Sequence, residues 1–234
     1  MSDASNPDYS ARALQGVRAI APLLPGIIPF GLIAGVTPVT LGYSWLDSLI
    51  GSLLMFAGAS QLAAYQLLGE GASLWVILLT IGAINLRYLL YSASIAPHLS
   101  DASRIKRWLA GYGLTDQIYA VCVRDYPIHT WSTGEKLAYY GGGTLVIWAL
   151  WQTCTLVGAL IGQVIPVFWS LEFMIPLTFL ALALGTLKTR AHRVAGLVGG
   201  AISLLGLNAP YNLGLIGGAV AGVAAGLWVQ RVWR

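Results

Sequence analysis

The sequence predicts an all-α, polytopic helical membrane protein, and three observations support this fold class. Of its 234 residues, 57% are hydrophobic and only 9% are charged, whereas a soluble domain contains about 25% charged residues. Long apolar runs recur along the chain, and about 20 such residues cross a hydrocarbon core of about 30 Å as a helix. The runs are continuous rather than alternating, which favours helices over the strands of a barrel.

Eight hydrophobic segments follow one another, separated by short polar or Pro/Gly breaks. No linker divides them, so we predict a single transmembrane bundle over residues 18–230. A polar cytoplasmic N-terminus (1–17) would precede it, without a cleaved signal peptide, and a short basic cytoplasmic tail (231–234) would follow it. The segments are 18–43, 46–68, 72–96, 108–124, 136–163, 170–187, 191–207 and 210–230.

Two segments should depart from a regular spanning helix. The first contains four prolines, at positions 22, 25, 29 and 38, and each removes a backbone donor and clashes with the preceding turn. The fourth is short and amphipathic, and it carries Asp116 near its middle. We therefore expect the first segment to be kinked or split, and neither segment to be an ordinary helix facing lipid.

The basic residues around the segments are expected on the cytoplasmic side of the membrane. Eight full crossings with a cytoplasmic C-terminus would instead place the basic cluster of residues 104–107 outside. We therefore expect about six to eight transmembrane segments, one or two of them kinked, broken or re-entrant, with the first, second and fourth as candidates. The basic residues are Arg231 and Arg234 after the last segment, Lys188, Arg190 and Arg193 before the seventh, and Arg104, Lys106 and Arg107 before the fourth.

The last segment carries a glycine at every fourth position, with alanines beside them. Such a smooth face lets another helix approach closely. We predict a packing face without chemistry, whose neighbour belongs either to this chain or to a partner subunit. The four glycines are Gly214, Gly218, Gly222 and Gly226.

Arg87 lies in the third segment, within the stretch AINLRYLLY (83–91). In a helix from Ser73 to Pro97 it lies about 21 Å from the first end and about 15 Å from the second, which is inside the hydrocarbon. Its stem could snorkel toward an interface, but snorkelling does not require the polar neighbours that surround it. These neighbours are Asn85, Tyr88, Tyr91, Ser92 and Ser94.

Helical phase divides these polar residues between two faces. Arg87 and Tyr91 share one face by their four-residue spacing, whereas Asn85 and Tyr88 share another. A straight helix would need protein or water on both faces. We therefore expect this helix to be central in the bundle or unwound near Asn85.

The second segment contains FAGASQ at residues 56–61, near its midpoint. Tight helix packing explains the small residues, and such a stretch is also where transporter helices break and expose backbone dipoles to a substrate. Gln61 is harder to explain by packing, because an unpaired amide in lipid costs several kcal/mol.

Asp116 is the only carboxylate in the fourth segment, and no other segment has one in its middle. An arginine and an aspartate in lipid are each costly alone, so the cheapest arrangement pairs them or exposes both to water. Two roles stay open for an Arg87–Asp116 pair. It is either a structural bridge, or a functional pair whose guanidinium receives an anionic substrate group while the carboxylate is released and protonated.

The sequence contains no constellation that indicates an enzyme, a metal or a cofactor. His98, His129 and His192 lie in loops, no serine has a buried histidine to activate it, and there is no phosphate loop. We interpret Cys122 and Cys154 as small, buried apolar residues. The net charge of +4 is concentrated between the apolar runs and forms no basic stripe interleaved with aromatics, so no nucleic-acid partner is expected.

Five stretches form a recognisable series in order and spacing. They are PFGLIAGV (29–36), FAGASQLAA (56–64), NLRYLLYSASIAPHL (85–99), LTDQIYAV (114–121) and FLALALGTL (179–187). This series resembles the AzlC family of branched-chain amino acid permeases over nearly the whole chain. The NLR and LTD motifs are its most specific parts.

The resemblance implies the large subunit of a two-component exporter in the cytoplasmic membrane. It also implies a small hydrophobic AzlD-type partner, a cargo of valine, leucine, isoleucine or methionine, and a proton gradient as the driving force. Where the family commonly has a second acid after Asp116, this chain has Gln117, so coupling here rests on Asp116 alone or differs. The matching motif positions are Ser60, Gln61, Asn85, Arg87, Tyr91, Thr115 and Asp116.

A zwitterionic amino acid needs an anion receptor, a cation acceptor and an apolar pocket. We assign substrate binding to Ser60, Gln61, Asn85, Arg87 and Tyr91 and charge coupling to Asp116 with Arg87, with Thr115 and Gln117 as further candidates. Three functions stay open: an exporter working by alternating access, a channel-like pore for a small ion or solute, and a non-transporting scaffold whose glycine face docks a partner.

Overall fold

The computed structural model describes residues 8–162, 187, 189–207 and 213–232. Contacts group the chain into two compact units, Met1–Leu171 and Glu172–Arg234, and each is described by itself. Helices are the only regular elements in these described ranges, which confirms the all-α class. The single bundle over residues 18–230 stays a prediction.

The first predicted segment is a helix interrupted by a 3₁₀ turn. It consists of α1 (Tyr9–Ile20), η1 (Ala21–Leu23) and α2 (Leu24–Thr40). Pro22 and Pro25 each lie in the first turn of their element, where a missing N–H removes no helical hydrogen bond. Pro22 and Pro25 therefore lie where one element passes into the next, whereas Pro29 and Pro38 lie inside α2, which continues through both.

Helix α1 begins well before residue 18 because Asp8 caps it. The Asp8 carboxylate accepts hydrogen bonds from the backbone N–H groups of Ser10 and Ala11, at 3.1 and 3.0 Å. A capping aspartate satisfies N–H groups that the first turn leaves free. The Ser10 hydroxyl bond to this carboxylate, followed by the Ala11 N–H bond, holds the pKa of Asp8 below its ordinary value.

The second predicted segment is broken in the middle. Helix α3 (Trp45–Leu54) starts with a capping box between Ser44 and Asp47, and α4 (Gly58–Gly69) follows after three non-helical residues. The break falls at residues 55–57, beside the small-residue stretch. Close packing also explains the small residues here, because a Cβ on Gly58 would lie 2.5 Å from the Trp151 ring.

The fourth predicted segment is broken as well, and this corrects the expected position of Asp116. Helix α6 (Arg104–Tyr112) ends before residues 113–115, and α7 (Asp116–Asp125) restarts after them. Thr115 caps α7, since its hydroxyl accepts a hydrogen bond from the N–H of Ile118 at 3.4 Å. Asp116 is therefore the first residue of a helix instead of lying near the middle of one.

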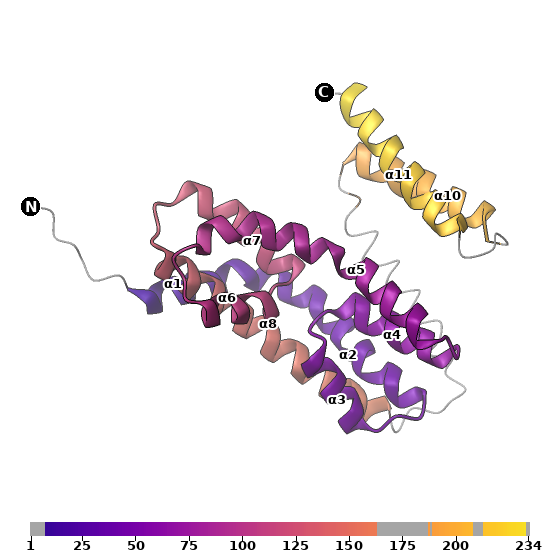
Figure 1. Ribbon diagram of the computed structural model, residues 1–234, viewed down its shortest axis with the longest axis horizontal. Helices are drawn as coiled ribbons and strands as arrows, with labels where there is room; N and C mark the ends of the chain where they lie inside the picture. The colour runs from indigo at the N-terminus through magenta and orange to yellow at the C-terminus, as the bar shows by residue number, and fades with distance from the viewer. Residues whose placement is uncertain (1–7, 163–186, 188, 208–212, 233–234) are drawn as a thin grey trace, which may run out of the picture. The chain divides into compact units, whose positions relative to one another are not determined.

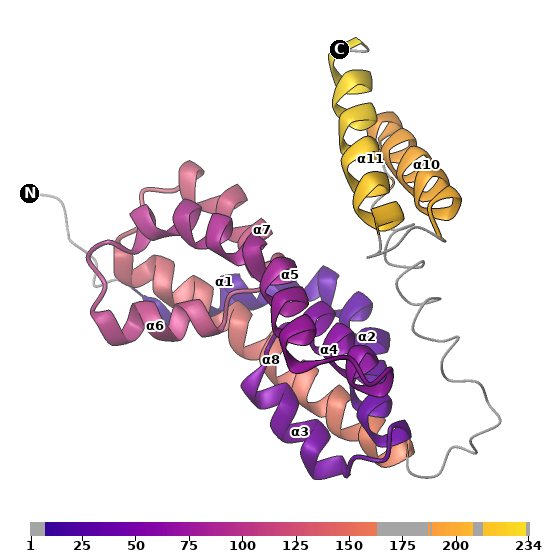
Figure 2. The same cartoon turned by 45° about the vertical axis from the view of Figure 1, so that its right-hand side comes forward.

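Helix α8 (Thr133–Gly162) runs along the first unit and packs against α1 and α2, as Figures 1 and 2 show. Glycines bring the backbones into direct contact along this seam. A Cβ on Gly142 would collide with the backbone of Ala13, and one on Gly158 with that of Leu32. The seam is thus packed backbone to backbone over several turns.

Three helical stretches in the described residues are long and apolar enough to cross a membrane: Tyr9–Thr40, Leu74–Leu99 and Thr133–Gly162. The second comprises α5 (Leu74–Ile95) and η2 (Ala96–Leu99). A further 3₁₀ turn, η3 (Tyr126–Ile128), follows α7. The predicted segments 72–96 and 136–163 are confirmed as continuous helices. Apart from residue 187, the predicted segment 170–187 lies outside the described residues.

In the second unit, α10 (Arg190–Leu205) packs against α11 (Leu213–Val232). The predicted glycine face of α11 is turned toward α10, so its neighbour is a helix of this chain. Each of its four glycines would place a Cβ against an atom of α10 or of the turn after it. The pairs are Gly214 with Gly206, Gly218 with Ser203, Gly222 with Ala195, and Gly226 with Ala195.

This packing predicts that Gly222→Leu will destabilise the second unit. A Cβ at Gly222 would lie 2.7 Å from the carbonyl oxygen of Ala195, and overpacking of this kind costs about 1–3 kcal/mol. Gly217→Leu is the matched control, because nothing lies within 4 Å of the corresponding Cβ. Thermal unfolding of the detergent-purified chain should show a lower melting temperature for the first variant only. Equal effects of the two variants would contradict the packing.

Candidate functional site

The candidate site lies along the middle of α5, where two half-helices begin. Ser60 in the first turn of α4 donates a hydrogen bond to the Asn85 Oδ1, and Asp116 at the start of α7 pairs with Arg87. The N-terminal ends of α4 and α7 therefore meet α5 at positions two residues apart. Figure 1 shows α4, α5 and α7 in the first unit.

Arg87 and Asp116 form a direct ion pair. The Arg87 Nη1 lies 2.8 Å from the Asp116 Oδ2, and the two side chains are 33% and 42% exposed. The Nε of Arg87 and the Oδ1 of Asp116 are buried and have no hydrogen-bond partner within ordinary distance, although Tyr88 interacts with Arg87 and Tyr91 with Asp116. The pair thus keeps unused donor and acceptor capacity on both of its members.

Three tyrosines surround this ion pair. The Arg87 guanidinium lies over the ring of Tyr88, with the Cζ 5.1 Å from the ring centroid, which is a favourable cation–π distance. Tyr91 stacks on Tyr119 of α7, with centroids 4.0 Å apart and planes 11° from parallel. These rings therefore lie on the same two helices as the ion pair.

Gln61 is the most isolated polar side chain of the site. It is 1% exposed, and neither its Nε2 nor its Oε1 has a hydrogen-bond partner. Its neighbour Ser60 is fully buried but is satisfied by Asn85. Buried polar groups in proteins are almost always paired, so the Gln61 amide needs a specific explanation.

Helix α5 is regular through Asn85, so our expectation that it is unwound there is wrong, and within the first unit it is only partly covered. At about 100° per residue, Asn85 and Arg87 lie at the two edges of one covered stripe about 160° wide. Ile77 and Ile95 in the middle of the stripe are buried, whereas the opposite face exposes residues such as Leu90, at 73%. Asn85 is therefore bonded by Ser60 of α4 at one edge of the stripe, and Arg87 pairs with Asp116 of α7 at the other.

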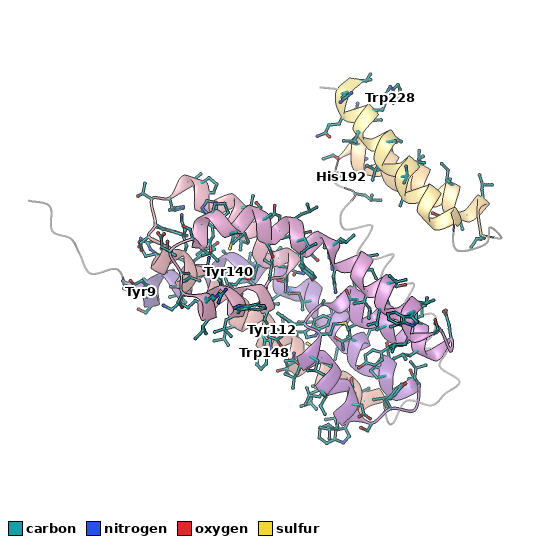
Figure 3. All side chains as sticks on the ribbon, viewed as in Figure 1. Tyr9, Tyr112, Tyr140, Trp148, His192 and Trp228 are labelled. Carbon is teal, nitrogen blue, oxygen red and sulfur yellow. The ribbon has the colours of Figure 1, made fainter. Side chains whose placement is uncertain are left out.

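The breaks in the two discontinuous helices are linked to each other. The Tyr112 hydroxyl at the end of α6 donates to the carbonyl oxygen of Leu53 near the end of α3, at 2.7 Å. The Trp148 Nε1 of α8 donates to the same hydroxyl at 3.2 Å, and Figure 3 shows Tyr112 and Trp148 together. The ring of Phe56 lies 6.0 Å from that of Tyr112.

The remaining predicted candidates are Thr115 and Gln117. Thr115 acts as the cap of α7, and Gln117 is half-buried beside Asp116. Sequence reasoning missed the roles of Tyr88, Tyr112 and Tyr119 at the site. Their signal was weak, although Tyr88 and Tyr119 lie close in sequence to the two charged residues that they contact or flank.

A groove of about 820 Å³ lies elsewhere, between α6 and α8. Its lining is mostly apolar and includes Leu109, Leu145 and Trp148. None of the predicted substrate-binding residues lines it, so the groove is distinct from the site on α5.

The comparison with protein families matches residues 22–165 to the family described as AzlC protein. The chain belongs to the AzlC family. The match runs from η1 to just beyond α8, so it includes every candidate residue on α4, α5 and α7. The glycine face of α11 lies outside the matched residues.

Individual AzlC relatives extend over nearly the whole chain. The inner membrane protein YgaZ of Escherichia coli is 27% identical, over 96% of this chain and 93% of its own length. An uncharacterized membrane protein of Archaeoglobus fulgidus is 32% identical, over 94% of this chain and 96% of its own length. No solved structure matches the chain. The family and these relatives show that this is a membrane protein.

The ion-pair geometry predicts coupling between Arg87 and Asp116 in folding. Arg87→Gln and Asp116→Asn should each destabilise the chain by about 1 kcal/mol, because each leaves a partly buried charge without its partner. The double variant should lose less than the sum of the two. Melting temperatures of the four proteins provide the double-mutant cycle, and strict additivity would contradict the pairing.

Proposed function

We propose that this chain is the permease subunit of an exporter for branched-chain or similar apolar amino acids. The observation that carries the proposal is the Arg87–Asp116 ion pair. The pair is partly exposed, its arginine lies in a helix long and apolar enough to span a membrane, and it retains unpartnered atoms on both members. Charged residues at such depth usually mark a substrate or ion pathway.

The mechanism follows from the charges of the substrate. A zwitterion brings one positive and one negative group, so it can replace one member of the ion pair as the pair opens. Asp116 is then released from Arg87 and becomes available for protonation, which would couple export to a proton gradient. The half-helix ends beside the pair supply oriented backbone dipoles, as discontinuous helices do in other transporters.

The proposal includes a location and a partner. We place the protein in the inner membrane, with both termini cytoplasmic, in keeping with the basic residues near its C-terminus and with the printed name of its relative YgaZ. The partner is a small hydrophobic membrane subunit of the AzlD type. The chain works as a transporter and not as an enzyme, without a bound cofactor.

Counterflow of labelled valine tests this function. Membrane vesicles should contain the chain together with a small hydrophobic subunit of the AzlD type, and unlabelled valine inside should drive uptake of label. Arg87→Ala should reduce this exchange by at least roughly 100-fold, because the Asp116 carboxylate then has no counter-charge in the empty protein and the exchange of partners on which transport depends is lost. The variant must still be present as folded protein in the membrane.

Arg124→Ala is the matched control. Arg124 also pairs with a neighbouring carboxylate, that of Asp125, but its side chain is 62% exposed, so its loss should leave exchange unchanged. Normal exchange by Arg87→Ala would rule out the proposed role of the ion pair. Flux that rises linearly with valine concentration and shows no counterflow would instead favour a pore, and no flux at all would favour a scaffold.

A further inference from the structure

We propose that the N-terminal end of α4, together with Gln61, binds the carboxylate of the amino acid. This inference rests on the proposed function and assigns one charged group of the substrate to a defined place. The ammonium group then competes with Arg87 for Asp116. Arg87 becomes the counter-ion of Asp116 in the empty protein, instead of the receptor for the anionic group.

The first argument is the contrast between the two half-helix ends on α5. The first N–H groups of any helix have no partner within it, and the helix dipole makes this end attractive to anions. At α7 the unpaired N–H groups have a cap and the dipole has a negative charge beside it, because Thr115 caps the helix and Asp116 supplies a carboxylate in its first turn. At α4 neither is present, since Ala57 provides no side-chain cap and the first turn contains no acid.

The second argument is the Gln61 amide itself. It is 1% exposed, and both of its polar atoms lack partners. Side chains on a helix lean toward its N-terminus, so Gln61 in the second turn of α4 extends over the uncapped end. Its Nε2 can donate to the same anion that the free N–H groups attract, and an unpaired buried amide costs about 1–3 kcal/mol until it does so.

The third argument concerns the walls around this end of α4. A Cβ on Gly58 would lie 2.5 Å from the ring of Trp151 and 2.6 Å from that of Phe30. Glycine is therefore required at the first position of the helix, and two aromatic rings border it. Such apolar walls exclude water and strengthen an electrostatic contact, and they also suit the aliphatic side chain of the cargo.

The fourth argument is the placement of opposite charges. Asn85 beside the α4 end and Arg87 beside Asp116 lie two residues apart on α5, which separates their Cα atoms by about 5 Å. The Oδ1 of Asp116 is buried and has no partner. Because the two sites lie at opposite edges of the covered stripe of α5, they are farther apart than this backbone distance. An amino acid therefore uses both only when Asp116 leaves Arg87 and approaches the α4 end, whereas a simple amine or a simple carboxylate satisfies only one of them.

Binding to the detergent-purified full chain tests the assignment. The probes are L-leucine and isopentylamine, which is leucine without its carboxylate. The wild type should bind leucine at least roughly tenfold more tightly than isopentylamine, and Gln61→Leu should lose most of this preference. The same variant should melt at an equal or higher temperature, because it removes an unpaired buried amide without reducing side-chain volume.

Gln66→Leu is the matched control, since Gln66 is an exposed glutamine on the same helix that bonds only to Glu70; this variant should keep the wild-type preference. If Gln61→Leu fails to fold, Gln61→Met keeps the length of the side chain and removes both polar atoms. An unchanged preference in the Gln61 variant would overturn the carboxylate site and leave the proposed function standing. Binding of neither probe by the wild type would overturn both.

Discussion

A backbone that breaks inside an apolar bundle must find partners for its free N–H and C=O groups, and this constraint organises the first unit. Side chains from other helices supply most of them. At the end of α3, the carbonyl of Leu53 is bonded by Tyr112 and that of Ser52 by Gln152 at 3.3 Å. The Trp151 Nε1 also donates to the Ser52 hydroxyl at 2.8 Å. Because water is scarce in hydrocarbon, these bonds allow a helix to stop halfway.

The same constraint explains why the start of α4 differs from the other helix ends. Helices α1, α3 and α7 begin with a side-chain cap. Helices α5 and α6 begin without one, but at exposed residues, whereas α4 follows the buried Ala57 and has no cap. An end left open at a stability cost is a common sign of a functional site. The neighbouring ion pair gives this open end a chemical context, because opposite charges lie two residues away along α5.

Much of this architecture can be predicted from the sequence, because long apolar runs have few alternatives in a membrane. The ranges of α5 and α8 and the breaks in the second and fourth segments follow from run length, small residues and amphipathicity. The juxtaposition of Arg87 and Asp116 follows from the cost of isolated charges. The start of α7 at Asp116 cannot be predicted in this way. It depends on Thr115 as a cap, and the sequence does not distinguish this threonine from any other. Whether α5 is central also cannot be read from phase alone, because two short helices cover its two polar edges.

The glycine seam between α8 and the α1–α2 helix limits where this protein can move. Side chains that interlock through flexible tips can slide by changing rotamers, but backbones in direct contact have no such freedom. A shift along this seam would bring residues that have a Cβ to the positions of Gly142 and Gly158, where a Cβ collides with main-chain atoms of Ala13 and Leu32. Within the first unit, α1, α2 and α8 therefore act as a fixed frame. The short helices α3, α4, α6 and α7 lie outside this seam and are not held by it.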